Sequence, residues 1–141
     1  MNIRKIKPED APVIVDLLEQ LGYPNTSSFI DDKIKLLLSN QNEYCMVAED
    51  QFNYVIAFIS IHIIPQIALQ GDFARISYFA VDEKQRGKGL GKILEEYCTQ
   101  IARERNCDRI ELHSHSRREK AHKFYFRQGY TDSPKYLVKK L

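Results

Sequence analysis

Apolar residues follow two periodicities along this chain. In four stretches they recur every three to four positions, the spacing that puts side chains on one face of an α-helix: residues 13–21, 30–38, 90–101 and 119–128. Elsewhere they alternate with polar residues or run continuously, as in β-strands: residues 3–6, 44–49, 54–64, 73–81 and 109–112, with a hairpin predicted over 130–141. The stretch 54–64 is apolar almost throughout, so we expect it to be a central strand.

The order of these elements predicts the fold class. Two helices follow the first strand, three strands come next, and the remaining two helices alternate with strands. A helix that crosses between neighbouring strands implies parallel pairing, whereas short turns imply antiparallel pairing. We therefore predict a mixed α/β (α+β) protein, with a mostly antiparallel sheet of six to seven strands flanked by about four helices. Residues 1–141 are expected to form a single domain.

Composition narrows the class of protein. Of the 141 residues 43% are apolar and 28% charged, and the formal net charge is +2, so we predict neither a nucleic-acid nor a membrane partner. No apolar run approaches the roughly 18 residues of a membrane span, and we expect no signal peptide. Cys45, Cys98 and Cys107 are odd in number and lack C-x-x-C spacing, which argues against disulfides and a zinc site. These features predict a cytoplasmic protein.

The segment between the strand at 73–81 and the helix at 90–101 carries the strongest chemical signal. It reads Arg86-Gly87-Lys88-Gly89-Leu90-Gly91-Lys92. Glycine allows close approach of a ligand to the backbone, and the N–H groups of a helix's first turn attract anions. Together with the three basic side chains, this predicts a cradle for a phosphate or pyrophosphate. A flexible hinge with solvated charges is the alternative interpretation.

This loop resembles the R/Q-x-x-G-x-G/A signature of the GNAT superfamily of N-acetyltransferases, which binds the pyrophosphate of acetyl-CoA. The predicted order of elements is similar to that superfamily along essentially the whole chain. The resemblance implies that acetyl-CoA is the acetyl donor and that the loop residues Arg86, Gly87, Lys88, Gly89, Leu90, Gly91 and Lys92 hold it. It also implies that the pantetheine arm binds the backbone of Phe79, Ala80 and Val81, as though it were an added strand.

A second motif lies near the C-terminus. The segment Ala121-His122-Lys123-Phe124-Tyr125-Phe126-Arg127-Gln128-Gly129-Tyr130 resembles the A-x-x-F-Y-x-x-x-G-[FY] pattern of the same superfamily. Tyr125 stands where those enzymes place the tyrosine that protonates the leaving thiolate, a role that a positioned phenol can fill. A core aromatic residue is the alternative. The resemblance implies an N-acetyltransferase in which a primary amine, expected on a small molecule, attacks acetyl-CoA directly in a ternary complex.

The sequence does not identify the general base. Some superfamily members carry a glutamate in the strand before the loop, but residues 75–81 contain none. Deprotonation can pass through water to His62, His113 or a backbone carbonyl, with Ser77 and Tyr78 as weaker substitutes. An amine that arrives already neutral is a further alternative, and all of these stay open. The predicted substrate-binding residues are Tyr23, Tyr78 and His113.

Several further interpretations stay open at this stage. Arg118 stands where many members of the superfamily carry an asparagine. In one interpretation Arg117 and Arg118 contact the coenzyme or the substrate, and in the other both are solvated. His113 and His115 share a strand face but lack further ligands at suitable spacing, so no metal is predicted. A non-catalytic acyl-CoA-binding module is the main alternative function. A dinucleotide-binding protein is less well supported, because its third glycine would come one residue later. Dimerisation is left open.

Overall fold

The computed structural model of the chain describes residues 1–133 and 135–141. The chain forms two compact units, Met1–Glu111 and Leu112–Leu141. The second unit contains one helix, α4 (Glu119–Arg127), among its described residues. The first unit contains the other elements, although the last residue of β5 lies beyond it: β1 (Asn2–Lys5), the 3-10 turn η1 (Pro8–Asp10), α1 (Ala11–Leu21), α2 (Ile30–Leu38), β2 (Glu43–Glu49), β3 (Val55–Ile64), β4 (Asp72–Val81), the 3-10 turn η2 (Glu83–Gln85), α3 (Leu90–Glu104) and β5 (Cys107–Leu112).

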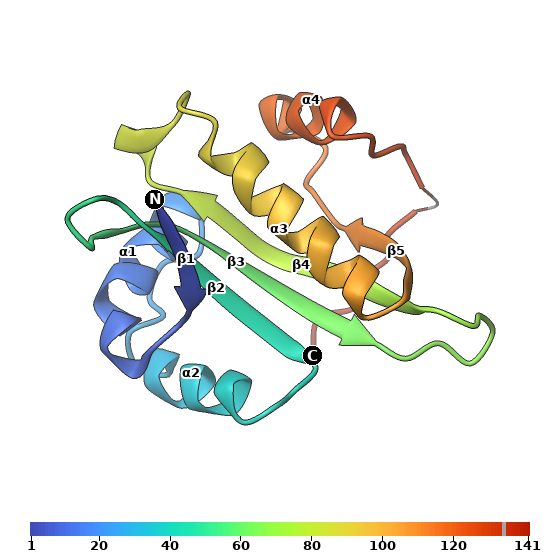
Figure 1. Cartoon of the computed structure of the whole chain (residues 1–141), viewed down its shortest axis with the longest axis horizontal. Helices are drawn as coiled ribbons and strands as arrows, with labels where there is room; N and C mark the ends of the chain where they lie inside the picture. The colour runs from blue at the N-terminus through green and yellow to red at the C-terminus, as the bar shows by residue number, and fades with distance from the viewer. Residues whose placement is uncertain (134) are drawn as a thin grey trace. The chain divides into compact units, whose positions relative to one another are not determined.

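The strands of the first unit form one sheet in the order β1-β2-β3-β4-β5, which is also their order along the chain. Neighbouring strands from β1 to β4 are antiparallel. The helix α3 connects β4 to β5, and these two strands point in the same direction (Figure 1). The mixed, mostly antiparallel sheet and the four α-helices of the described chain confirm the predicted fold class.

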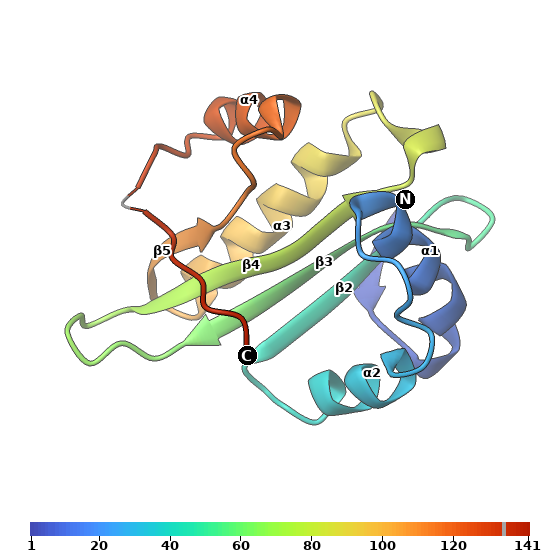
Figure 2. The ribbon, with the colours of Figure 1, turned by 180° about the vertical axis from the view of Figure 1, so that it is seen from behind.

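Helices cover both faces of the sheet. Figure 1 shows α3 in front of the strands, and the reverse view in Figure 2 shows α1 and α2 on the opposite face. Under α1 and α2 the buried core includes Leu17, Ile34, Val47, Phe58 and Ala80. On the other face α3 packs against β3 and β4. Burial on both faces explains why the sequence of β3 is apolar at nearly every position.

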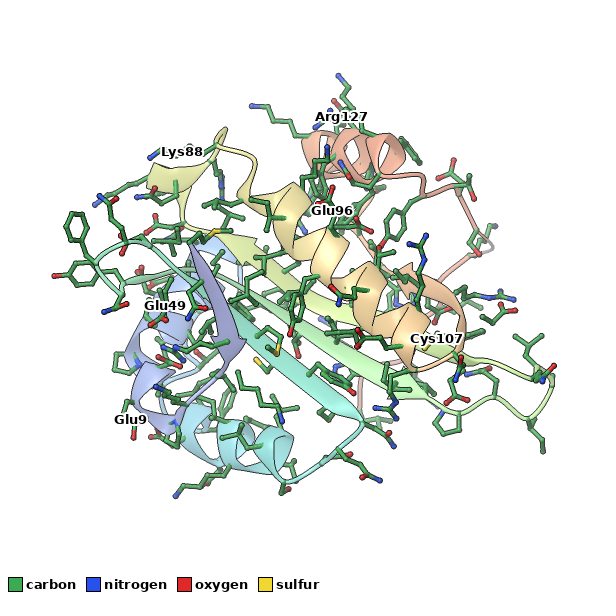
Figure 3. All side chains as sticks on the ribbon, viewed as in Figure 1. Glu9, Glu49, Lys88, Glu96, Cys107 and Arg127 are labelled. Carbon is green, nitrogen blue, oxygen red and sulfur yellow. The ribbon has the colours of Figure 1, made fainter. Side chains whose placement is uncertain are left out.

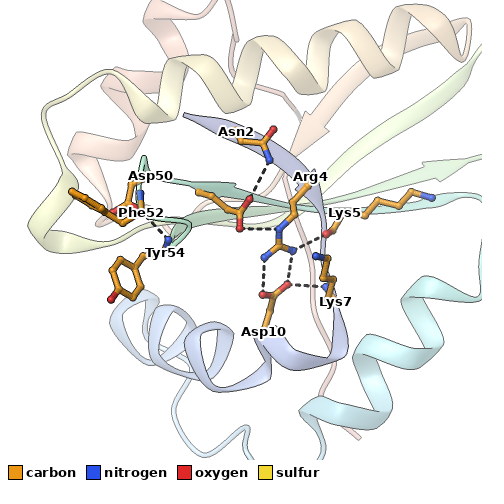
Figure 4. Close-up of polar contacts among 9 residues, drawn as sticks. Asn2, Arg4, Lys5, Lys7, Asp10, Asp50, Phe52 and Tyr54 are labelled. Atoms are coloured by element: carbon orange, nitrogen blue, oxygen red, sulfur yellow. Dashed lines mark hydrogen bonds and ion pairs between the residues drawn. The ribbon is translucent and has the colours of Figure 1, made fainter.

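A charged network anchors the N-terminal strand (Figure 4). Arg4 in β1 makes two parallel hydrogen bonds to the carboxylate of Asp10 in η1, at 2.8 and 2.9 Å. Its Nε lies 3.1 Å from Glu49 at the end of β2, which also accepts a hydrogen bond from Asn2. The backbone N–H of Lys7 donates to Asp10 at 2.7 Å. Every charged group here has a partner, so the network ties β1, η1 and β2 together.

The predicted number of strands is wrong. The sheet has five strands rather than six or seven, because the described residues of the expected C-terminal hairpin, 130–133 and 135–141, contain no strand. Pro134, at the expected turn, lies outside the described residues. Tyr136 and Val138 are 61% and 68% exposed, so this segment buries little apolar surface, and a hairpin without a packed face is marginal in water. No described helix is long and apolar enough to cross a bilayer.

Candidate active site

The glycine loop turns the chain from β4 into α3. Asp82 begins the turn, where its side chain accepts a hydrogen bond from the N–H of Lys84 at 3.0 Å. Gly87 and Gly89 then adopt left-handed conformations, with φ of +80° and +79°. A Cβ at either glycine would meet no other atom within 4 Å. Backbone conformation rather than lack of space therefore requires glycine at both positions.

This turn presents backbone donors and positive charge together. The N–H groups of Leu90, Gly91 and Lys92 form the first turn of α3, whose helical bonds begin with the N–H of Ile93 to the carbonyl of Gly89, so these three donors have no partner within the helix. The side chains of Arg86, Lys88 and Lys92 are exposed around these groups. Lys88 projects from the outer end of the loop (Figure 3). The loop can therefore bind an anion with several oxygen atoms.

The predicted pantetheine-binding residues end strand β4. Phe79–Val81 pair on one side with residues 57–59 of β3. On the other side, the side chains of Arg75 and Glu111 meet at 2.8 Å, which places Glu111 of β5 level with Arg75 of β4. Because β5 ends one residue later, at Leu112, the end of β4 continues beyond it.

Two of the predicted substrate residues meet. Gly22 ends α1 in a left-handed conformation, with φ of +108°, and the N–H of Tyr23 donates back to the carbonyl of Leu18 at 2.8 Å. This turn carries Tyr23 to Tyr78 of β4, where the two rings pack edge to face with centroids 5.2 Å apart. Both side chains are partly exposed, at 50% and 39%. The pair forms an aromatic surface that is accessible to a ligand.

A line of polar side chains crosses the sheet beside this pair. The carboxylate of Glu43 in β2 contacts Nδ1 of His62 in β3. The other ring nitrogen of His62, Nε2, lies 2.6 Å from Oγ of Ser77 in β4. The sequence indicates His62 and Ser77 as separate candidates for the base and gives no signal for Glu43. The residue types alone carry no signal that joins them, since only strand register brings them together.

Tyr125 and His113 lie in the second unit. Tyr125 is half-buried on α4, and its ring packs edge to face with those of Phe124 and Tyr130, at centroid distances of 5.2 and 5.5 Å. His113 is exposed and stacks on Tyr136 with centroids 4.2 Å apart. His115 accepts a hydrogen bond from the N–H of Arg117 at 3.2 Å. No group of three or more metal-binding side chains occurs among the residues that the structure describes.

Comparison with known proteins identifies the family. The sequence model of the acetyltransferase (GNAT) family matches residues 11–130, which include the glycine loop and the Tyr125 motif. The chain belongs to this family. It is therefore a GNAT acetyltransferase, as the two motifs indicated. No curated protein matches the chain in sequence.

Solved structures share the fold of this GNAT protein. A GNAT family acetyltransferase from Staphylococcus aureus matches with a TM-score of 0.82 and 20% identity, over 99% of this chain and 98% of that one. Glucosamine-6-phosphate N-acetyltransferase from Arabidopsis thaliana gives 0.84 and 23%, over 99% and 97%. A transcriptional regulator from Bacillus halodurans gives 0.88 and 22%, over 99% of each chain. At these identities the likeness concerns the fold.

Proposed function

We propose that this GNAT protein transfers the acetyl group of acetyl-CoA to the primary amine of a small molecule. The glycine loop carries the proposal. The pyrophosphate of coenzyme A is an anion with several acceptor oxygens, and residues 86–92 offer backbone N–H groups with three exposed basic side chains. A helix N-terminus and a run of backbone N–H groups are suited to such an anion.

In the proposed reaction the amine attacks the thioester carbonyl directly, in a ternary complex. The pantetheine arm would lie along Phe79–Val81, where β4 continues past the end of β5. Backbone N–H groups at a strand end can stabilise the oxyanion that forms on the carbonyl. Coenzyme A leaves as a thiolate, and we assign its protonation to the hydroxyl of Tyr125.

We propose a cationic small amine as the acceptor. The aromatic pair Tyr23 and Tyr78 is accessible, and aromatic faces attract cations. The carboxylate of Glu43 lies on a nearby strand, and a negative charge favours a cationic ligand. The Arabidopsis relative is named for glucosamine 6-phosphate, an amino sugar, which suggests amino sugars as the first acceptors to try. A nearly balanced net charge of +2 gives no support for nucleic acid as a partner.

The cytoplasmic location predicted from the sequence has support from the thiols. Burial, with nearby carboxylates, raises the pKa of Cys45 and of Cys98 to about 12, so both stay protonated at neutral pH. Cys107 is partly buried, and all three thiols are free. Unpaired thiols fit a reducing compartment.

The binding step is tested by calorimetric titration with acetyl-CoA, with NADH as the control ligand. We expect saturable binding of acetyl-CoA alone. Gly89→Ala should weaken it by about tenfold, or about 1.4 kcal/mol, because alanine resists the left-handed conformation that the loop needs. Gly22→Ala is a matched control, since Gly22 is also left-handed with open space around it but lies at the end of α1.

Each outcome has a distinct meaning. No binding of acetyl-CoA, or equal affinities for the wild type and Gly89→Ala, would refute the cradle. Binding of NADH alone would favour a dinucleotide site. Binding of acetyl-CoA without release of thiol in the presence of any amine from a panel of amino sugars and aminoalkyl compounds would favour a non-catalytic acyl-CoA-binding module.

A further inference from the structure

Glu43, His62 and Ser77 form a continuous line of polar contacts across β2, β3 and β4. Glu43 and His62 are directly opposite each other in register, and the Glu43 carboxylate contacts His62 Nδ1. Nε2 of His62 is 2.6 Å from Oγ of Ser77. Side chains alternate between the two faces of a strand, so Glu43 shares the face of Cys45, which α1 and α2 cover further along.

A β-bulge brings Ser77 into this line. Ser60 pairs with Tyr78 and Ile61 with Ile76, so Ser77 is an extra residue without an opposite partner in the register. A bulge redirects a side chain that regular alternation would send elsewhere. Here it places Ser77 near His62. Strand β4 therefore contributes a second polar side chain besides Arg75, which is opposite His62 in register.

The two neighbours of His62 determine the roles of its ring nitrogens. An ionised carboxylate only accepts hydrogen bonds, so Nδ1 carries the proton and donates to Glu43. Nε2 of the neutral ring then has its lone pair free to accept the hydroxyl proton of Ser77. The carbonyl of Ser60 lies 3.4 Å from Ser77 Oγ. Once Nε2 is protonated, it becomes a donor. The hydroxyl proton of Ser77 can then be accepted by the Ser60 carbonyl instead.

Charged side chains lie near His62 on the adjoining strands. Arg75 is directly opposite His62 in register, and its guanidinium is hydrogen-bonded to Glu111 of β5. Glu43 of β2 and Arg75 of β4 are therefore the charged residues opposite His62 in register, and the charge of Arg75 is already paired with Glu111. Of these groups, the carboxylate of Glu43 contacts the ring.

The exposed end of the line lies next to the proposed acceptor surface. Ser77 is exposed, and the following residue, Tyr78, forms the aromatic pair with Tyr23. Phe79, which begins the proposed pantetheine segment, is the next residue along β4. The segment Arg75–Val81 itself contains no carboxylate.

We propose that His62 is the general base of the acetyl transfer, that Ser77 relays the proton to it, and that Glu43 positions the ring. A primary amine has a reference pKa of about 10.4, so it arrives as an ammonium ion at neutral pH and must lose a proton before it attacks. The ammonium donates a proton to Ser77 Oγ as the Ser77 hydroxyl proton passes to His62 Nε2. The products are a neutral amine and an imidazolium that donates to Glu43. This inference rests on the proposed function.

The tautomer of His62 is tested without any acceptor. Long-range ¹H–¹⁵N spectra of the ¹⁵N-labelled protein distinguish a neutral imidazole that carries its proton on Nδ1 from one that carries it on Nε2. We expect His62 to carry it on Nδ1. A proton on Nε2 of the neutral ring would overturn the relay, because that nitrogen then has no lone pair to accept the proton.

The catalytic role is tested with His62→Gln, Ser77→Ala and the double variant. Each single change should lower kcat/KM for the amine by about 100-fold near pH 7, with the dissociation constant of acetyl-CoA unchanged. The double variant should be no slower than either single variant, because the two groups act as one unit. The deficit should shrink as the pH approaches about 10, where the amine loses its proton unaided. His115→Gln, an exposed histidine of the second unit, is the matched control and should resemble the wild type.

Other results would contradict the relay in recognisable ways. Independent losses that multiply in the double variant, or a deficit that is constant with pH, would indicate structural damage instead. An acetyl group found on Ser77 by mass spectrometry after incubation with acetyl-CoA would make Ser77 a nucleophile. If His62→Gln turned over at the wild-type rate, the proton relay would be refuted, while the proposed acetyl transfer would stand. Failure of the wild type to bind acetyl-CoA would remove the proposed function as a whole.

Discussion

Tyr125 differs from its neighbours Phe124 and Phe126 by one oxygen atom. Its ring is held by edge-to-face contacts with Phe124 and Tyr130, so the packing of α4 uses the aromatic body of the residue. The hydroxyl is what the proposed chemistry needs. A phenol has a reference pKa of about 10 and a thiol about 8.5, values close enough for a positioned phenol to donate as thiolate charge develops.

Tyr125→Phe should therefore separate chemistry from packing. We expect kcat to fall by about 100-fold, the usual scale of lost acid–base catalysis, while the dissociation constant of acetyl-CoA changes little. Steady-state thiol release and calorimetry measure the two parts. Tyr130→Phe makes the same chemical change in the neighbouring ring and should leave kcat near the wild-type value. An unchanged kcat in Tyr125→Phe would exclude Tyr125 as the acid.

At the scale of the elements, Gly71, just before β4, lies in a crowded position. A Cβ built there would lie 2.6 Å from the backbone nitrogen of Asp108 and 2.8 Å from the backbone oxygen of Asn106. Both atoms belong to the chain that enters β5. Backbone atoms move less readily than the end of a side chain, so the glycine lets the start of β4 and the start of β5 touch.

Gly71→Ala should separate these strand ends. We expect it to lower the free energy of unfolding by about 1–3 kcal/mol, the usual range for overpacking, and the unfolding midpoint by about 5 °C. Thermal and urea denaturation measure the change. Gln70→Ala, an exposed position immediately before it, should have little effect. If Gly71→Ala unfolds like the wild type, the contact seen between the two strand ends is not tight in solution.

Most elements could be predicted because their patterns are local. The predicted helices and the strands at 3–6, 44–49, 54–64, 73–81 and 109–112 agree with the structure to within a few residues. The C-terminal hairpin failed because alternation alone does not supply a surface on which Tyr136 and Val138 could pack. The glycine loop was predictable for the same reason as the helices, since its chemistry lies in consecutive residues.

The polar line could not be predicted because two bulges set its register. Counting outward from the pair Glu49 and Val55 would place Glu43 opposite Ile61. A bulge between Ala48 and Glu49 shifts the pairing by one residue, so that Glu43 instead faces His62. The second bulge makes Ser77 the extra residue of β4. A shift of one position exchanges the two faces of a strand, and no local pattern in the sequence specifies it.

At the scale of the whole molecule, the network around Arg4 links folding to pH. Burial alone would raise the pKa of Asp10, but the hydrogen bonds from the Arg4 guanidinium and the Lys7 N–H outweigh it and hold the pKa below its ordinary value. The hydrogen bond from Asn2, together with that from Arg4, lowers the pKa of Glu49. The same contacts raise the pKa of Arg4 above its ordinary value, against the opposing effect of burial. Both carboxylates are therefore more acidic in the folded chain than in the unfolded one.

This difference fixes the sign of the pH dependence. A carboxylate whose pKa is lower in the folded state contributes stability that is fully present above its unfolded pKa, about 4, and is lost as the pH falls through its folded pKa. Stability should therefore decline below about pH 4. Arg4→Gln removes the partner of two carboxylates, and the loss of its two hydrogen bonds to Asp10 should lower the free energy of unfolding at pH 7 by about 2–3 kcal/mol. Its deficit should shrink in acid, where the carboxylates of the wild type are protonated too.

Urea denaturation of both proteins from pH 7 to pH 3 measures the two curves, and we expect them to converge as the pH falls. Lys5→Gln provides the matched control, because it removes an adjacent positive charge whose side chain makes no contact in this network. It should follow the wild type throughout. If Arg4→Gln instead ran parallel to the wild type at every pH, its deficit would come from lost packing. The paired carboxylates would then contribute nothing to the acid sensitivity of the fold.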